Sequence, residues 1–257
     1  MRCLFYSIAS ILLLSLAVAM PAKALSVMAP DAVNTECPVS GQPDDKKTDA
    51  VEAATWDGDP YLLTTCAASG RPIDVKGTPT TKVIEGRELK FCCGGCAAAV
   101  EKDPAKWLGK VDKAQIAAQA PIYPTETCCI SGEPLMEKNA EGVMEYIGTD
   151  VIVKNRLFRV CCKMCAKKIM ESPEASALML NAAVVKAQGA AYALEACVLN
   201  DKGDITKESA KTFVIGGRLM KTCCGGCEAK VRANPTEYVA KVDTALAAKR
   251  EKAAAAK

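Results

Sequence analysis

The sequence contains no histidine among its 257 residues. Histidine is the commonest metal-binding side chain and the commonest general base near neutral pH, so such chemistry must use cysteine, methionine or carboxylates. Aromatic residues are also scarce, with four Phe, six Tyr and two Trp. One large hydrophobic core would normally contain more of them. The fifteen cysteines indicate instead several small units, each stabilised by a metal ion or by disulfides because its own core is small.

Patterns typical of catalysis are missing as well. The sequence shows no paired carboxylates, no Ser-His-Asp set and no phosphate-binding glycine loop, so we expect the protein not to be an enzyme. The formal net charge is +3, and this balance does not favour nucleic acid as a partner. The basic, alanine-rich tail at residues 249–257 is expected to be a solvated or fraying helix end.

Long apolar runs are limited to the beginning of the sequence. Arg2 precedes the apolar run Leu4–Met20, and Ala22-Lys23-Ala24 follows it with the small-x-small pattern of a cleavage site. No later run approaches the ~20 apolar residues needed to span a bilayer. We therefore expect residues 1–24 to be a signal peptide and the mature protein to be periplasmic or secreted, without a membrane span.

A CCxxC motif, here called the knuckle, occurs three times. Its copies are Cys92-Cys93-Gly94-Gly95-Cys96, Cys161-Cys162-Lys163-Met164-Cys165 and Cys223-Cys224-Gly225-Gly226-Cys227. Each copy follows two β-like runs separated by a turn that contains Gly or Asn, which predicts a β-hairpin. Each copy precedes an Ala- and Lys-rich stretch that we expect to be helical. In the first copy a break at Asp103-Pro104 predicts two helices, and Pro104 and Pro235 suit a first helical turn.

A further cysteine, here called the opening cysteine, precedes each knuckle. The opening cysteines are Cys66, Cys128 and Cys197, and they lie 26, 33 and 26 residues before the knuckle. The middle unit therefore carries seven extra residues, which we expect around Glu137–Tyr146. Cys37 begins a half copy that has the opening motif and no knuckle.

Each unit thus offers four sulfur atoms to one ion. The predicted ligands are Cys66, Cys92, Cys93 and Cys96; Cys128, Cys161, Cys162 and Cys165; and Cys197, Cys223, Cys224 and Cys227. Four thiolates suit zinc, which is the expected cofactor. Neighbouring residues on a strand point to opposite faces, so one cysteine of each adjacent pair need not reach the ion. Three thiolates would suit Cu(I) or another soft metal better.

Disulfides are the main alternative for these cysteines. Without Cys3 in the signal peptide fourteen cysteines remain, an even number, and an export compartment is usually oxidising. The opening cysteines would then pair with knuckle cysteines in a stapled scaffold. A thiol–disulfide oxidoreductase is a third hypothesis, because CxxC is its reactive motif, although the usual thioredoxin-like frame is absent from the pattern.

The motifs resemble the YHS and TRASH families of cysteine-rich metal-binding domains. In the first unit the matching residues are Cys66, Ser69, Gly70, Pro72, Phe91, Cys92, Cys96, Asp103, Pro104, Lys106 and Trp107. The resemblance covers roughly residues 60–245 and implies a treble-clef-like, zinc-ribbon fold with a role in heavy-metal sensing, trafficking or resistance. The second cysteine of each knuckle is an addition to the family pattern, and the third unit lacks S-G-x-P. These departures leave the fourth ligand open.

The expected organisation is an α+β array of small modules, each consisting of a hairpin, a knuckle and helices. We predict a signal peptide (1–24), a segment with the half repeat (25–59), module 1 (60–120), module 2 (121–189), module 3 (190–248) and the basic tail (249–257). The predicted partners are metal ions. The pattern identifies neither a protein partner nor a role for Cys37 and Cys129.

Overall fold

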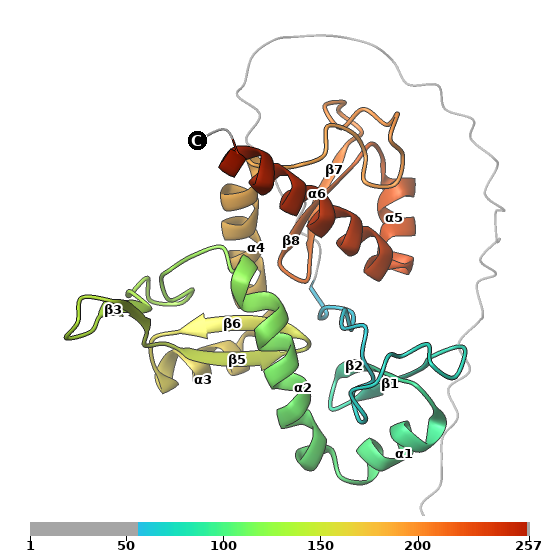
Figure 1. Cartoon of the computed structure of the whole chain (residues 1–257), viewed down its shortest axis with the longest axis vertical. Helices are drawn as coiled ribbons and strands as arrows, with labels where there is room; N and C mark the ends of the chain where they lie inside the picture. Colours follow the sequence, from blue (N-terminus) through green and yellow to red (C-terminus); the bar gives the residue numbers. More distant parts are fainter. Residues whose placement is uncertain (1–55, 256–257) are drawn as a thin grey trace, which may run out of the picture. The chain divides into compact units, whose positions relative to one another are not determined.

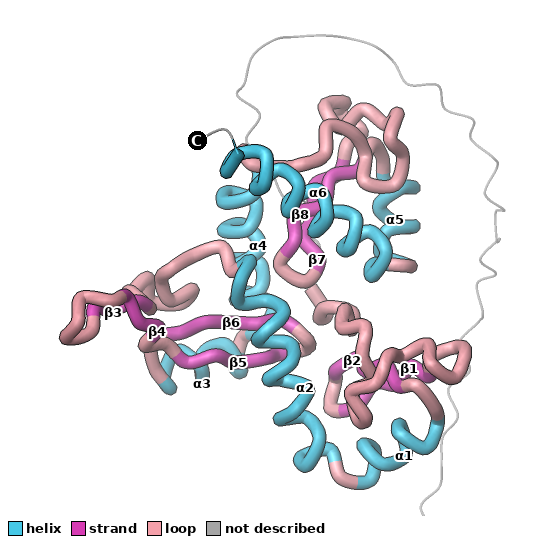
Figure 2. The backbone as a smooth tube through the Cα atoms, viewed as in Figure 1, coloured by secondary structure: helices cyan, strands magenta, loops and turns pink. Residues whose placement is uncertain are grey.

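The structure is a computed structural model that describes residues 56–255, and each structural statement below concerns this part of the chain. The predicted signal peptide and the half repeat at Cys37 lie outside the described residues. Three β-hairpins, each followed by two helices, confirm a mixed α+β architecture of repeated small units (Figure 1). Figure 2 shows that the strands form separate two-stranded pieces, all of which are antiparallel.

The three modules share one order of elements. Module 1 contains β1 (Thr80–Ile84), β2 (Arg87–Phe91), α1 (Gly94–Lys102), α2 (Pro104–Gln119) and the 3-10 helix η1 (Ala120–Ile122). Module 2 contains β5 (Thr149–Val153), β6 (Arg156–Val160), α3 (Lys163–Glu171) and α4 (Pro173–Gly189). Module 3 contains β7 (Lys211–Ile215), β8 (Arg218–Thr222), α5 (Gly225–Ala233) and α6 (Pro235–Ala255). The predicted basic tail is therefore helical as far as Ala255.

The insertion of seven residues in module 2 lies within an additional hairpin. This hairpin consists of β3 (Met136–Lys138) and β4 (Met144–Tyr146), at the place where the sequence predicts the insertion. Tyr146 from this hairpin donates a hydrogen bond of 2.5 Å to Asp150 at the start of β5. The insertion thus attaches to the hairpin of the module and leaves the order of its other elements unchanged.

Local sequence signals explain the hairpin turns and the helix starts. Each turn of the module hairpins has two consecutive residues with positive φ, as a type I′ turn requires: Glu85 and Gly86, Lys154 and Asn155, and Gly216 and Gly217. Proline begins the second helix of every module, where its missing N–H costs nothing. Asp103 caps α2 by accepting a hydrogen bond from the Lys106 amide at 3.4 Å. Asn234, which holds the same position in module 3, instead donates to Glu237 Oε2 at 2.8 Å.

Each module has its own small core beneath the hairpin. Module 1 buries Leu89 and Phe91 of β2 against Val100 of α1, and Trp107 packs half-buried over this cluster. Module 3 buries Met220 against Val231, with Tyr238 in the position that Trp107 occupies in module 1. Cores of this size gain little free energy, which is why additional links within and between modules matter.

A buried arginine ties each hairpin to a helix. Arginine is the first residue of the second strand in every module, and its partner is the residue eight positions after the helix-starting proline. The contacts are Arg87 Nη1–Asp112 Oδ1 at 2.7 Å, Arg156 Nη1–Asn181 Oδ1 at 2.9 Å, and Arg218 Nη2–Asp243 Oδ2 at 3.0 Å. This contact therefore belongs to the repeat itself.

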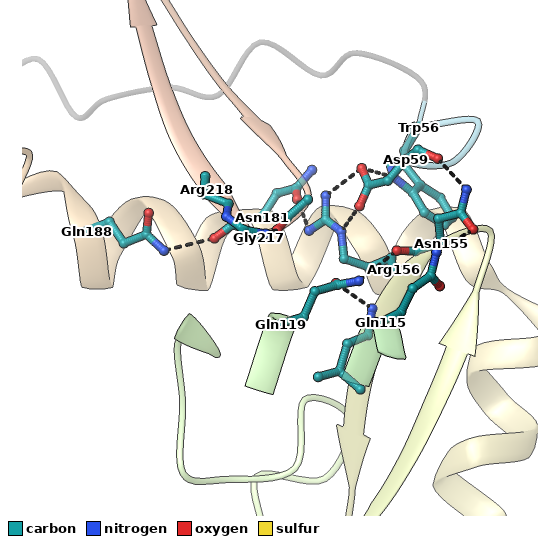
Figure 3. A network of polar contacts seen from close by, with 12 residues as sticks. Trp56, Asp59, Gln115, Gln119, Asn155, Arg156, Asn181, Gln188, Gly217 and Arg218 are labelled. Carbon is teal, nitrogen blue, oxygen red and sulfur yellow. Dashed lines mark hydrogen bonds and ion pairs between the residues drawn. The ribbon is translucent and has the colours of Figure 1, made fainter. Parts of the chain in front are cut away.

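Asn155 at the hairpin turn of module 2 connects modules 1 and 2. Its Nδ2 atom donates to the carbonyl oxygens of Asp59 and Glu88, at 3.0 and 2.8 Å. Its Oδ1 atom accepts from Arg87 Nε at 3.3 Å and from Gln115 Nε2 at 2.9 Å. Figure 3 shows this side chain within a continuous polar network. All four hydrogen-bonding positions of a buried amide are thereby satisfied.

A side-chain amide in the last turn of α2 forms hydrogen bonds to the hairpin of the next module. Gln119 Nε2 donates to the Asn155 carbonyl at 2.9 Å, and Gln119 Oε1 accepts from the Leu157 amide at 2.9 Å. Gln119 lies fifteen residues after Pro104. We call this two-bond contact the amide clamp.

The amide clamp recurs between modules 2 and 3. Gln188, fifteen residues after Pro173, donates to the Gly217 carbonyl at 2.9 Å and accepts from the Leu219 amide at 2.9 Å (Figure 3). Both clamps thus fix the second helix of one module on the hairpin of the next by the same backbone groups. Each of the two clamps therefore joins a module to the module that follows it in the sequence.

Replacing Gln188 by alanine should weaken the link between modules 2 and 3. The change leaves the Leu219 amide and the Gly217 carbonyl without partners, which costs about 1–3 kcal/mol when such groups stay buried. Native-state hydrogen exchange should show faster exchange of the Leu219 amide, while Lys186→Ala on the exposed face of α4 should not. Equal exchange in both variants would mean that the clamp adds no stability.

Candidate metal centres

The opening cysteines of modules 1 and 2 lie in two separate tight turns of the same kind. In module 1 the Cys66 amide donates to the Arg71 carbonyl at 2.6 Å, and the Gly70 amide donates to the Cys66 carbonyl at 2.9 Å. Gly70 has a φ of +69°, a conformation that glycine adopts without strain. The turn directs the Ser69 amide at Cys66 Sγ, at 3.5 Å. This amide stabilises negative charge on the sulfur.

Module 2 repeats this arrangement closely. The Gly132 amide donates to the Cys128 carbonyl at 2.9 Å, and the Ser131 amide points at Cys128 Sγ at 3.4 Å. The Ser131 hydroxyl also lies 3.3 Å from Cys161 Sγ of the knuckle. In module 1 the corresponding distance, from Ser69 Oγ to Cys92 Sγ, is 3.6 Å. One serine thus contacts both the opening cysteine and the knuckle.

Module 3 reaches the same geometry with a different turn. The Cys197 amide donates to the Gly203 carbonyl at 2.8 Å, and the Gly203 amide donates to the Asn200 carbonyl at 2.7 Å. A Cβ atom on Gly203 would lie 2.7 Å from Cys197 Cβ and 3.0 Å from Cys223 Sγ. Only glycine fits there without displacing neighbouring atoms, so Gly203 lets the opening turn of module 3 lie close to the knuckle.

A backbone hydrogen bond joins each opening turn to its hairpin. The residue after the opening cysteine donates to the residue two positions before the knuckle: Ala67 to Lys90 at 3.0 Å, Cys129 to Arg159 at 3.4 Å, and Val198 to Lys221 at 3.1 Å. In modules 2 and 3 a tyrosine hydroxyl adds a second link, since the amides of Arg159 and Lys221 donate to Tyr123 and Tyr192, both at 3.0 Å. These bonds bring cysteines far apart in sequence to one point.

Three cysteine triads result. Within each triad the sulfur atoms all lie within 4.8 Å of one another: Cys66, Cys92 and Cys96; Cys128, Cys161 and Cys165; and Cys197, Cys223 and Cys227. The two knuckle sulfurs of each triad are 3.8, 3.8 and 3.6 Å apart. A tetrahedral ion with Zn–S bonds of ~2.3 Å places its sulfurs ~3.8 Å apart. Each triad therefore has the spacing of ligands around a single metal ion.

The triads include nine of the twelve cysteines that the sequence predicts as ligands. The other three are the second knuckle cysteines, Cys93, Cys162 and Cys224, and each is the N-cap residue of the helix that follows. They are partly exposed and lie beside their triads. Cys129 also stays outside, because it alternates away from Cys128 and contacts the Tyr123 hydroxyl. All thirteen described cysteines are free thiols.

The acidity of the thiols differs within each triad. Burial alone would raise the pKa of Cys66 and of Cys128, but hydrogen bonds from the following serine and from backbone amides outweigh it and lower both values to about 6. Burial, together with the neighbouring thiols, raises the pKa of Cys96, Cys165 and Cys227 to about 12. At neutral pH the metal-free triads of modules 1 and 2 therefore carry a thiolate at the opening cysteine and keep protons on Cys96 and Cys165, which a cation would displace.

These shifts predict an unusual pH dependence for the reduced, metal-free chain. Cys66 has a pKa of about 6, below its ordinary value of 9.0, so its contribution to stability is complete above pH 9 and is lost as the pH falls through 6. Cys96 has a pKa of about 12, so its contribution is complete below pH 9 and is lost as the pH rises through 12. The combined contribution of these two thiols to the stability of module 1 is therefore largest near pH 9.

Urea unfolding of the reduced chain in chelator should test this expectation. Wild type should gain stability between pH 6 and pH 9 relative to a Cys66→Ser, Cys128→Ser variant, which lacks the two acidic thiols. A difference between the two proteins that stays constant over this range would contradict the assignment of the anionic charge to the opening cysteines.

No membrane-spanning helix is found among residues 56–255. Sequence reasoning missed the contacts of Ser69 and Ser131 with two sulfurs, although the S-G-x-P motif marked both residues. It also missed Gly203.

No protein-family model, curated protein or solved structure matches the chain. The proposed function therefore depends on the geometry of the triads.

Proposed function

We propose that this is an exported, non-enzymatic metal-binding protein whose three modules each hold one soft ion through a cysteine triad. The recurrence of the triad in three modules carries the proposal, because Ser69 and Ser131 in two modules and Gly203 in the third keep the sulfurs together by different means. Zn²⁺ and Cu(I) are the ions that such a set favours, since each triad consists of sulfur alone.

Export and a role in metal trafficking or sequestration complete the proposal. The leader-like pattern of residues 1–24 supports export, and the resemblance to YHS and TRASH domains supports a treble-clef-like fold and heavy-metal handling. Triads with partly exposed knuckle sulfurs favour exchangeable ions over permanently enclosed ones. A partner that donates or accepts the ion would approach on the knuckle side of each module.

Native mass spectrometry of the chain purified from its export compartment tests the proposal directly. We expect about three Zn²⁺ or Cu(I) ions per chain, and Cu(I) should displace Zn²⁺ when added to the zinc-loaded protein. Thiol counting on the same sample should find the triad cysteines reduced. Protein that arrives without ions and with its triad sulfurs joined in disulfides would overturn the proposal in favour of a stapled scaffold.

A further inference from the structure

The second cysteine of each knuckle has no role in the triads, yet it occupies the same place in all three modules. Cys93, Cys162 and Cys224 are N-cap residues with extended backbone, at φ values of −168°, −157° and −165°. The third residue of the following helix is the last triad cysteine, namely Cys96, Cys165 or Cys227. Each knuckle therefore contains a pair of cysteines on one helical turn, of which only one belongs to a triad.

The two cysteines of each pair lie on one side of the first helical turn, because one is the N-cap and the other is the third residue of the helix. Residues three apart on a helical turn have Cβ atoms about 5–6 Å apart, and a disulfide requires Cβ separations of about 3.5–4.5 Å. Closing the pair into a disulfide therefore requires a local adjustment that brings the two Cβ atoms closer together.

We propose that Cys93, Cys162 and Cys224 are switching thiols, each of which forms a disulfide with the last cysteine of its triad and thereby releases the ion. This inference rests on the proposed metal binding and adds its regulation. The last triad cysteine cannot serve both purposes, because its sulfur is either a metal ligand or half of a disulfide. Oxidation leaves two sulfurs at the ion, fewer than the three or four that hold zinc in proteins.

The oxidant is another disulfide, either of a protein or of a small molecule such as oxidised glutathione. In module 1 the Cys93 thiolate attacks one sulfur of that disulfide, forming a mixed disulfide and expelling one thiolate. The Cys96 thiolate then leaves the ion, attacks the Cys93 sulfur and expels the second thiolate. One disulfide is formed and one is reduced, and the Cys93 proton passes through solvent to a departing thiolate. A dithiol reductant reverses the sequence.

The switching thiol is the point of attack because it is partly exposed and lies outside the triad. Cys66 and Cys92 are buried at 2% and 4% exposure, and Cys96, which is partly exposed like Cys93, belongs to the triad. In module 2 Cys128 and Cys165 are buried, and the partly exposed Cys161 belongs to the triad whereas Cys162 does not. The attack needs no opening of the small core.

The test compares zinc release from wild type and from a Cys93→Ser, Cys162→Ser, Cys224→Ser variant. Both proteins, as full chains, are loaded with zinc and treated with oxidised glutathione, and released zinc is followed with a colorimetric chelator. Peptide mapping then identifies the disulfides. Cys129→Ser is the matched control, since Cys129 belongs neither to a triad nor to a knuckle.

Wild type and the control should release zinc together with formation of the 93–96, 162–165 and 224–227 disulfides. The triple variant should bind about three ions and release them about tenfold more slowly when ~0.1 mM reduced glutathione is also present, because the missing neighbouring thiol acts at an effective concentration of roughly millimolar. Equal release rates, disulfides confined to the triads, or loss of zinc binding in the variant would each overturn the switch. Failure of wild type to bind zinc would instead reject the proposed function.

Discussion

Replacing Cys128 by alanine should reduce the number of bound ions from about three to about two, while the same change at the adjacent Cys129 should leave all three. Cys128 is buried at 2% exposure and shares a triad with Cys161 and Cys165. Cys129 points toward the Tyr123 hydroxyl instead. Two cysteines that are neighbours in sequence thus have opposite expected effects, which makes each the natural control for the other.

The same pair of variants should separate metal binding from folding of module 2. Trp56 packs edge-on against Phe158 in the core of this module, with ring centroids 6.3 Å apart, so its fluorescence reports on module 2. A Trp107→Phe background removes the only other tryptophan. Zinc at a thousand times its dissociation constant should stabilise the Cys129→Ala protein by about 4 kcal/mol and should not stabilise module 2 of Cys128→Ala.

Stoichiometry from native mass spectrometry and the Trp56 melting curve together decide the result. Loss of an ion in Cys129→Ala would place that sulfur in the site and contradict the triad. Retention of three ions in Cys128→Ala would show that two sulfurs and an outside ligand are enough at module 2.

The local parts of this fold could be predicted because their signals lie within a few residues. The turns at Gly86, Asn155 and Gly217 need a positive φ, and glycine and asparagine are the residue types that indicate this conformation. Proline at the start of a second helix marks the break after the first, as at Pro104. The opening cysteine and the knuckle were also recognisable, since they repeat with a fixed spacing in modules 1 and 3.

The composition of each triad could not be read from spacing alone. Cys92 and Cys93 lie 26 and 27 residues after Cys66, and only the end of β2 and the start of α1 decide that Cys92 joins the triad while Cys93 becomes an N-cap. The hydrogen bond from Ala67 to Lys90 joins segments that no short-range pattern connects. Long-range pairing of this kind depends on how the turn packs against the hairpin.

The polar contacts within and between modules leave a sequence pattern that becomes visible only when the repeats are aligned on their helix-starting prolines. Position eight then gives Asp112, Asn181 and Asp243, and position fifteen gives Gln119 and Gln188. A polar residue that recurs at one helical position in otherwise divergent repeats indicates a shared contact. The identity of the contact still required the structure, because each partner lies on a hairpin of the same or the following module.

Removal of the buried charge at Arg156 should cause the largest loss of stability among the polar contacts. Arg156 is 1% exposed and forms an ion pair with Asp59, whose side chain is 4% exposed, and Arg156 Nη2 donates to Asp59 Oδ1 at 3.0 Å. Arg156→Met would leave the buried Asp59 carboxylate without a cationic partner and with only the 3.5 Å hydrogen bond from Trp56 Nε1, and such a loss costs about 3–5 kcal/mol. Urea unfolding followed through Trp56, three residues from Asp59, should detect this loss.

The exposure of the partner at each equivalent position turns this expectation into a ranking. Asp112 and Asp243 are 35% and 39% exposed, so water can solvate either carboxylate when its arginine is removed. Arg87→Met and Arg218→Met should therefore lower the free energy of unfolding less than Arg156→Met does. The exposed Arg232–Glu228 pair should contribute no more than about 0.5 kcal/mol.

Removing both charges, in Asp59→Leu with Arg156→Met, should recover most of the stability, because an apolar pair needs no partner. Equal losses at the three arginines, or no recovery in the double variant, would mean that packing of the arginine stem rather than the stranded charge sets the cost.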